Sequence, residues 1–269
     1  MRLVPIVRPL LAAALCCAVL PVFAHEFWIA PDRYRIAPGD PLTAQFKNGE
    51  NFDGINLGFF DRRSVRFDLI QGGSVQTLRP RIGSIPALDR SAPHHDGLMV
   101  LAHETAPQTI TYSSWETFQR FADHKGFADI RARHLARGLP LDGFTERYTR
   151  HVKALIGVGS GLGSDSALGL ETEFVVLRNP YTDDLSAGLP VQLFYQGAPR
   201  SGAQIELFAR APDGTVTVTT HRTDDKGQAR LPVRAGHVYL LDAVMLRDSA
   251  DAENAVWDTL WAALTFAVP

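Results

Sequence analysis

The segment Gln204-Ile-Glu-Leu-Phe-Ala209 decides the predicted fold, because its side chains alternate between two faces. The odd-numbered residues are apolar and share one face, as alternate residues of an extended strand do. The same alternation recurs at residues 229–234, and turn signals such as Pro212-Asp213-Gly214 separate such runs. Roughly six or seven short strands are expected in residues 171–269, which is typical of an immunoglobulin-like or transthyretin-like β-sandwich.

Residues 25–112 show a turn signal about every ten residues, which predicts a second β-rich part. Pro38-Gly39, Asn48-Gly49 and Gly72-Gly73 are examples, and strand-like apolar runs lie between them. This spacing favours antiparallel strands joined by short connections. The predicted fold class is therefore mainly β.

A two-helix insert is predicted between the two β-rich parts, over about residues 113–156. Ser113 and Glu116 have the spacing of a capping box, which marks the start of a helix. A second helix is predicted from an apolar stripe that recurs every three or four residues. The stripe consists of Phe144, Tyr148, Val152, Leu155 and Ile156. A Gly/Ser linker at 157–169 follows, so the predicted domains are 25–170 and 171–269.

The first 24 residues have the organisation of a secretory signal peptide. Two arginines precede an apolar run of about 11 residues, which is too short to span a bilayer. Ala24 is the small residue expected before a cleavage site. We therefore expect export to the periplasm and a mature chain that starts at His25. Cleavage would remove Cys16 and Cys17, the two cysteines, and leave no thiol for a disulfide or a metal.

Charge and hydropathy exclude several kinds of partner. The whole chain has 27 Lys and Arg against 29 Asp and Glu. The loss of two leader arginines would make the mature chain mildly acidic, and it has no basic patch. We expect no nucleic-acid partner and, without a second long apolar run, no membrane span in the mature chain.

A chain that begins with histidine offers a metal two nitrogen ligands from one residue. The α-amine and imidazole of His25 can close a chelate ring. One further imidazole would complete a histidine brace, which suits copper(II) and, less selectively, nickel(II). The α-amine has an ordinary pKa of about 8, so a metal can displace its proton at neutral pH. His25 is the main candidate ligand, on condition that the chain is cleaved before it.

Two of the nine histidines, His103 and His95, are the strongest candidates for the further imidazole. His103 follows the apolar run 98–102, and His95 lies in a polar loop. His134 and His151 lie among arginines of the predicted helices and are expected to be solvated. Acidic residues could add oxygen ligands, although beside turns such residues usually form solvated caps. They are Glu26, Asp32 and Asp40.

The opening His25–Pro31, with the sequence HEFWIAP, resembles the mature start of the exported bacterial family labelled domain of unknown function 4198. The similarity covers essentially the whole mature chain. Further landmarks are Glu146–Arg150, Asn179-Pro180-Tyr181, Gly197-Ala198-Pro199, Thr223–Gly227 and Trp257–Phe266. Family members are often described as periplasmic components of cobalt or nickel uptake systems. The resemblance therefore implies an exported metal-handling protein with a C-terminal sandwich.

The resemblance also implies a histidine ligand in the strand where this chain has Ala243-Val244-Met245. Met245 would then supply a thioether in place of a nitrogen ligand. That change would weaken the site or shift it toward copper(I).

The leading hypothesis is a non-enzymatic periplasmic protein that binds nickel, cobalt or copper and serves a membrane metal transporter as an accessory. Its expected ligands are His25 with His103, His95 or Met245. The second hypothesis is a ligand-presenting or adhesion-like sandwich protein without a metal role. The third is a copper-dependent oxidative enzyme that uses the same histidine brace.

Overall fold

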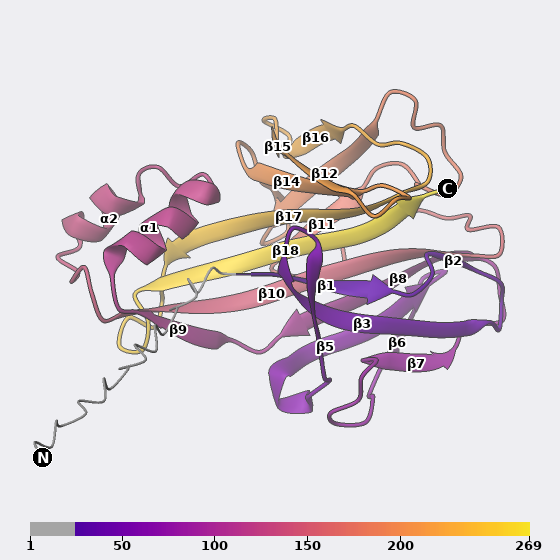
Figure 1. The fold of residues 1–269 in the computed structure, drawn as a ribbon, viewed down its shortest axis with the longest axis horizontal. Helices are drawn as coiled ribbons and strands as arrows, with labels where there is room; N and C mark the ends of the chain where they lie inside the picture. Colours follow the sequence, from indigo (N-terminus) through magenta and orange to yellow (C-terminus); the bar gives the residue numbers. More distant parts are fainter. Residues whose placement is uncertain (1–24) are drawn as a thin grey trace, which may run out of the picture.

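The computed structural model describes residues 25–269, so the predicted signal peptide lies outside the described residues. Strands dominate this part of the chain and form three sheets, which we call sheets A, B and C (Figure 1). The predicted mainly β class with a two-helix insert is confirmed. None of the helices within residues 25–269 has the length and apolar character that a membrane crossing needs.

Sheets A and C are small antiparallel sheets, each built around one central strand. In sheet A, β3 pairs with the other three strands, and in sheet C, β12 does so. Sheet A consists of β1 (Glu26–Pro31), β3 (Pro41–Glu50), β4 (Asp53–Leu57) and β7 (Leu88–Ser91). Sheet C consists of β11 (Thr172–Val176), β12 (Leu189–Tyr195), β13 (Ala198–Pro199) and β16 (Gln228–Leu231).

Sheet B has ten strands and takes them from both sides of the predicted boundary at residue 170. In spatial order its main path is β15 (Val216–Arg222), β14 (Gln204–Arg210), β17 (His237–Asp248), β18 (Trp257–Val268), β10 (Phe144–Val158), β8 (Gly97–Thr105), β5 (Ser64–Gln71) and β6 (Ser74–Thr77). The short strands β2 (Arg35–Ile36) and β9 (Gln108–Tyr112) also pair with β10. A short 3-10 helix, η1 (Asp61–Arg63), precedes β5.

The second predicted helix is wrong, because residues 144–158 form the strand β10. Phe144, Tyr148, Val152 and Ile156 recur every four residues, a spacing that puts side chains on one face of a helix and also of a strand. The extended form prevails because β10 pairs in parallel with β18 and antiparallel with β8 and β9. The helical insert is therefore shorter than predicted. It consists of α1 (Trp115–His124) and α2 (Ile130–Ala136).

The prediction that His134 and His151 are solvated is also wrong. His151 lies in β10 and is 1% exposed. His134 is fully buried on α2, where its Nε2 donates to the Pro140 carbonyl and its Nδ1 accepts a hydrogen bond from Trp257. The two residues are buried because β10 is an inner strand of sheet B and α2 packs against β18.

Sheet B is the central layer of the molecule. Val152, Ala154 and Ile156 of β10 pack in a core shared with sheet A, whereas Leu155 packs in a core shared with sheet C. Successive residues of a strand point to opposite faces. Sheets A and C therefore cover opposite faces of sheet B.

The two helices cover the same face of sheet B as sheet A does. Trp257 and Trp261 of β18 stack on Phe118 and Phe121 of α1. Both tryptophans share a strand face with Ala263, which belongs to the core under sheet A. The helices and sheet A thus lie side by side, and the beginning of β1 lies at the seam between them (Figure 1).

Candidate functional site at the start of the first strand

A buried lysine joins the helical insert to three strands. Lys125 follows α1 directly, is 5% exposed, and its backbone N–H donates to the Phe121 carbonyl. Its ammonium donates to Glu26 of β1 at 3.1 Å, to Asp242 of β17 at 2.8 Å, and to Glu206 of β14. We call Lys125 and these three carboxylates the lysine hub.

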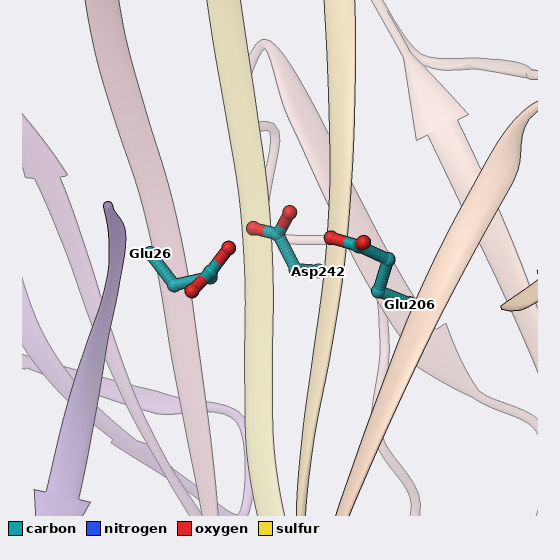
Figure 2. Close-up of side chains that lie close together, drawn as sticks. All are labelled: Glu26, Glu206 and Asp242. Carbon is teal, nitrogen blue, oxygen red and sulfur yellow. The ribbon is translucent and has the colours of Figure 1, made fainter. Parts of the chain in front are cut away.

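The three carboxylates of the lysine hub are close enough to hold a cation together. One oxygen of each lies within 4.8 Å of the others, and Figure 2 shows them turned toward one another from separate strands. The ammonium of Lys125 is the cation that they contact. An all-oxygen set suits hard cations rather than nickel or copper. The hub therefore lacks the donors predicted for a transition-metal site.

Burial and charge pull the pKa values in the lysine hub in different directions. Burial raises the pKa of Glu26 and of Asp242, against the attraction of Lys125. Burial acts on Glu206 in the same sense, but hydrogen bonds from His124 and Lys125 bring its pKa below the ordinary value. The Nε2 of His124 lies 2.7 Å from Glu206, and this hydrogen bond raises the pKa of His124. A protonated His124 thus offsets part of the hub's excess negative charge.

His25 lies directly before β1, and two side chains hold its backbone. The Nη1 of Arg150 donates to the His25 carbonyl at 2.8 Å. The Nδ2 of Asn48 donates to the Glu26 carbonyl at 2.9 Å and reaches the His25 carbonyl at 3.5 Å. The buried side chain of Glu26 adds a third attachment through Lys125. A chain cleaved before His25 would present its α-amine from a fixed point.

The His25 ring is partly exposed beside Glu50. Its Nε2 lies 3.6 Å from Glu50 Oε1, and the two side chains are 40% and 44% exposed. Asn48 and Asp53 also line the open pocket around His25. A carboxylate beside Nε2 favours the tautomer that carries its proton there. That tautomer leaves Nδ1 free to chelate a metal together with the α-amine.

A pocket of about 480 Å³ lies over the lysine hub, and Glu26, Lys125 and Glu206 are part of its lining. Glu50 lines this pocket and also the pocket around His25, so the two pockets share that residue. Arg120 and His124 contribute positive groups to the pocket over the hub, and Phe208 contributes an apolar wall.

The structure places His103 in β8, enclosed by aromatic rings. It is 2% exposed, and the rings of Phe27, Phe46 and Phe67 surround it. Its Nε2 lies 2.9 Å from Ser64 Oγ, and its Nδ1 has no hydrogen-bond partner within residues 25–269. Burial lowers the pKa of His103 to about 3. His103 therefore lies in the core beneath β1 as a neutral ring.

The structure does not bring His95 or Met245 to His25. His95 lies in the loop before β8, and its carbonyl accepts a hydrogen bond from Gln71. Most of β8 separates it from His103, a distance of about 20 Å along an extended strand. Met245 lies in β17, three residues after Asp242, so the two side chains point to opposite faces of sheet B. Asp242 faces the lysine hub, and Met245 faces the other layer.

Sequence reasoning missed Lys125, Asn48, Glu50 and Arg150, but one signal was visible. Asp242 lies inside an apolar run, and Glu26 lies inside the apolar opening of the mature chain. Carboxylates in buried strands are normally paired. The partner could not be named, because Lys125 is separated from Glu26 by 99 positions and from Asp242 by 117.

The sequence matches the family described as Domain of unknown function (DUF4198) over residues 22–247, which confirms the resemblance seen in the opening segment. No curated protein matches the sequence.

Solved structures that are similar to the chain include the following two. The "D0-D1 domain of Intimin" is 11% identical with a TM-score of 0.21, and the match covers 89% of this chain and 97% of that chain. A tetra-tandem repeat in the extending region of a large adhesion protein is 9% identical with a TM-score of 0.22. That match covers 91% of this chain and 50% of the adhesion chain. TM-scores this low carry no argument about function.

Proposed function

The chain belongs to the DUF4198 family, and we propose that it is an exported protein that binds one divalent transition-metal ion as its cargo at His25. Nickel, cobalt and copper are the candidate ions. The periplasm would be the site of binding, and a membrane metal transporter would be the recipient.

The observation that carries the proposal is the fixed position of His25. Arg150 and Asn48 both donate to its carbonyl, and the neighbouring Glu26 side chain is tied to Lys125. A chelating residue that is already held in place loses little conformational freedom when it binds a metal. The α-amine and the imidazole would then supply two nitrogen ligands that suit nickel and copper.

Glu50 supports the same proposal from the far side of the His25 ring. Histidines that ligate a metal commonly donate their other ring N–H to a carboxylate, which fixes the tautomer and makes the ligand more basic. Glu50 Oε1 lies 3.6 Å from Nε2 of His25. Asp53 and Asn48 line the same open pocket and offer oxygen atoms for further coordination. This partial exposure suits a protein that must both load and release its cargo.

The decisive experiment compares two chains that differ by one residue. The exported protein, with its first residue verified as His25 by mass spectrometry, is titrated with Ni²⁺, Co²⁺ and Cu²⁺ by calorimetry. The matched control has one alanine added before His25, which turns the α-amine into an amide and keeps every side chain. We expect the control to bind about 100-fold more weakly or worse, since one arm of a chelate is lost. Equal affinity of the two chains would refute the proposal.

A second variant tests the role of Glu50 without altering the chelating residue. Glu50→Gln should weaken metal binding by about 10- to 100-fold, as the loss of a carboxylate behind a ligating histidine does. Glu253→Gln, a change at an exposed residue outside the pocket around His25, is the matched control and should bind metal as the unmodified protein does. If both variants bind alike, Glu50 does not support the His25 ring.

A further inference from the structure

A further, smaller pocket lies beside the His25 carbonyl, between sheets A and B. Its volume is about 90 Å³. Arg150 and Asn48, the residues that hold the His25 carbonyl, are part of its lining. The side chain of His25 itself is not part of this lining.

Arg150 is a buried cation that forms no ion pair within the described residues 25–269. It is 9% exposed, and its guanidinium makes one hydrogen bond within residues 25–269, to the His25 carbonyl. Three aromatic rings surround the guanidinium at 5.2–5.6 Å from their centroids; they belong to Phe27, Tyr148 and Trp261. Buried charges are normally paired with an opposite charge. The unpaired donors of Arg150 are therefore the unusual feature of this pocket.

The nearest carboxylates do not serve as that pair. Glu26, Asp242 and Glu146 act on Arg150 only through longer-range attraction, and burial lowers the pKa of Arg150 in spite of them. Glu26 and Asp242 contact Lys125. Glu146 accepts hydrogen bonds from Tyr112 and Thr259 instead.

The remaining walls of the pocket combine polar and apolar side chains. The hydroxyl of Ser64 lies against the ring of His103, and Arg63 adds a second positive charge over the ring of Phe60. Phe46, Leu57 and Phe60 supply apolar wall. A ligand that fits these walls carries a negative charge at one end and hydrocarbon at the other. Inorganic phosphate would meet the aromatic walls with unsatisfied oxygens, which is costly.

We propose that this pocket binds a short-chain organic monocarboxylate, with the carboxylate against Arg150 and the hydrocarbon chain against Phe46, Leu57 and Phe60. An apolar cavity of about 150 Å³ holds benzene. The smaller volume of 90 Å³ fits an aliphatic acid of about two to four carbons by that comparison. The site is separate from the proposed metal site, so either can be correct without the other.

The test uses the exported full-length mature protein and acetate, propionate and butyrate as probes. Ligands of this size bind in roughly the micromolar to millimolar range, so saturation-transfer NMR and calorimetry are suitable measurements. We expect saturable binding of a carboxylate and none of propionamide, its neutral counterpart. Saturable binding of propionamide with similar affinity, or of phosphate in preference to every carboxylate, would overturn the assignment.

Two variants locate the binding in this pocket. Arg150→Gln should weaken carboxylate binding by about 30-fold or more, because it removes the charge that faces the ligand. The matched control is Arg62→Gln, which removes a nearby positive charge at an exposed residue outside the pocket lining. Leu57→Trp fills the pocket from its apolar wall without touching Arg150, so it tests the pocket even if Arg150→Gln fails to fold. Carboxylate binding that survives in folded Leu57→Trp would overturn the proposal.

The same variants separate this proposal from the metal site. Leu57→Trp should abolish carboxylate binding and leave metal binding unchanged, since Leu57 does not line the pocket around His25. His25→Ala should abolish metal binding and leave carboxylate binding unchanged. Loss of both ligands in both variants would mean that the two pockets are one site.

Discussion

Two buried lysines lie in different layers of the molecule and are accommodated differently. Lys153 of β10 donates to Asp165 at 2.7 Å and to the carbonyls of Ser166 and Phe174 at 3.0 Å each. These partners lie 12 to 21 positions away in the sequence. Lys125, in contrast, contacts three carboxylates that lie 81 to 117 positions away.

The two lysines differ in how their charge is balanced. Lys153 makes its closest contact with one carboxylate, and two carbonyls accept its other protons, so its charge and hydrogen bonds are matched locally. The lysine hub has three carboxylates for one ammonium and lies against a pocket that reaches the surface. Because of this excess negative charge, we expect the stability of the seam beside His25 to depend on pH.

Removing the hub's cation should have the largest effect. Lys125→Met leaves three buried carboxylates without their cation and should lower the free energy of unfolding by about 5 kcal/mol at neutral pH. Urea unfolding followed by fluorescence measures it. The deficit should shrink as the pH falls, because burial raises the pKa values of Glu26 and Asp242 and protons can then neutralise both carboxylates. A loss below about 1 kcal/mol would fit a surface pair and contradict the importance of the hub.

Removing the main partner of the other buried lysine should lower the free energy of unfolding by less, because fewer charges are left unpaired. Asp165→Asn removes the carboxylate closest to Lys153, leaving Glu173 at 3.8 Å. We expect a loss of about 3 kcal/mol in the free energy of unfolding. This variant should leave metal binding at His25 unchanged, since Asp165 contacts Lys153 on the face of sheet B that sheet C covers. A change in metal affinity would show that the two layers are coupled.

Removing one carboxylate from the lysine hub should barely change the free energy of unfolding, in contrast to Asp165→Asn. Glu26→Gln keeps an acceptor for Lys125, and two carboxylates still balance the ammonium, so we expect a change within about 1 kcal/mol. Burial raises the pKa of Glu26 in the folded protein. Folded protein therefore binds this proton more tightly than unfolded protein, and stability falls as the pH rises above 4.5. The free energy of unfolding, measured as the pH rises above 4.5, should fall less for Glu26→Gln than for the unmodified protein. An equal fall in the two proteins would contradict this prediction.

The smallest effect is expected at His124. Its hydrogen bond to Glu206 raises its pKa, so its contribution to stability is complete below pH 6.5 and is lost as the pH rises through the raised value. The side chain is 63% exposed, and solvent screening keeps the contribution below about 1 kcal/mol. The free energy of unfolding of His124→Gln should therefore be lower than that of the unmodified protein at about pH 6, and the two values should be equal at about pH 9. His94→Gln, in an exposed loop, is the control and should show no such convergence.

The sequence predicted those elements whose pattern permits one interpretation. The alternation at 204–209 appears as β14 at Gln204–Arg210, and the predicted first helix appears as α1, with Ser114 rather than Ser113 as its N-cap and without the predicted capping box. The pattern at 144–156 permits two interpretations, because a spacing of four belongs to both a helix and a strand. Only the pairing of β10 with β18 decides between them, and that pairing joins segments far apart in the sequence.

The candidate site was predictable only in its first residue. His25 was singled out by its position, and the structure adds the contacts that hold it. Glu50 reaches His25 through the pairing of β1 with β3, and Arg150 reaches it from β10. No local pattern encodes such contacts, because they depend on which strands lie side by side. The same holds for Lys125, whose three carboxylate partners lie 81 to 117 positions away in the sequence.

The parallel pairing of β10 with β18 has a consequence for the time course of folding. Glu146 lies opposite Trp257 in that ladder, and Thr265 of β18 also donates to the Ile29 carbonyl of β1, 236 positions away. The entropy of closing such long loops is lost before any contact is gained. The central sheet therefore cannot form completely until β18 has been synthesised. Folding should take roughly milliseconds to seconds, as expected for domains dominated by distant pairings. Until β18 arrives, β10 and β17 each expose the edge that β18 covers, so the newly made chain is most vulnerable to proteolysis and aggregation during that interval.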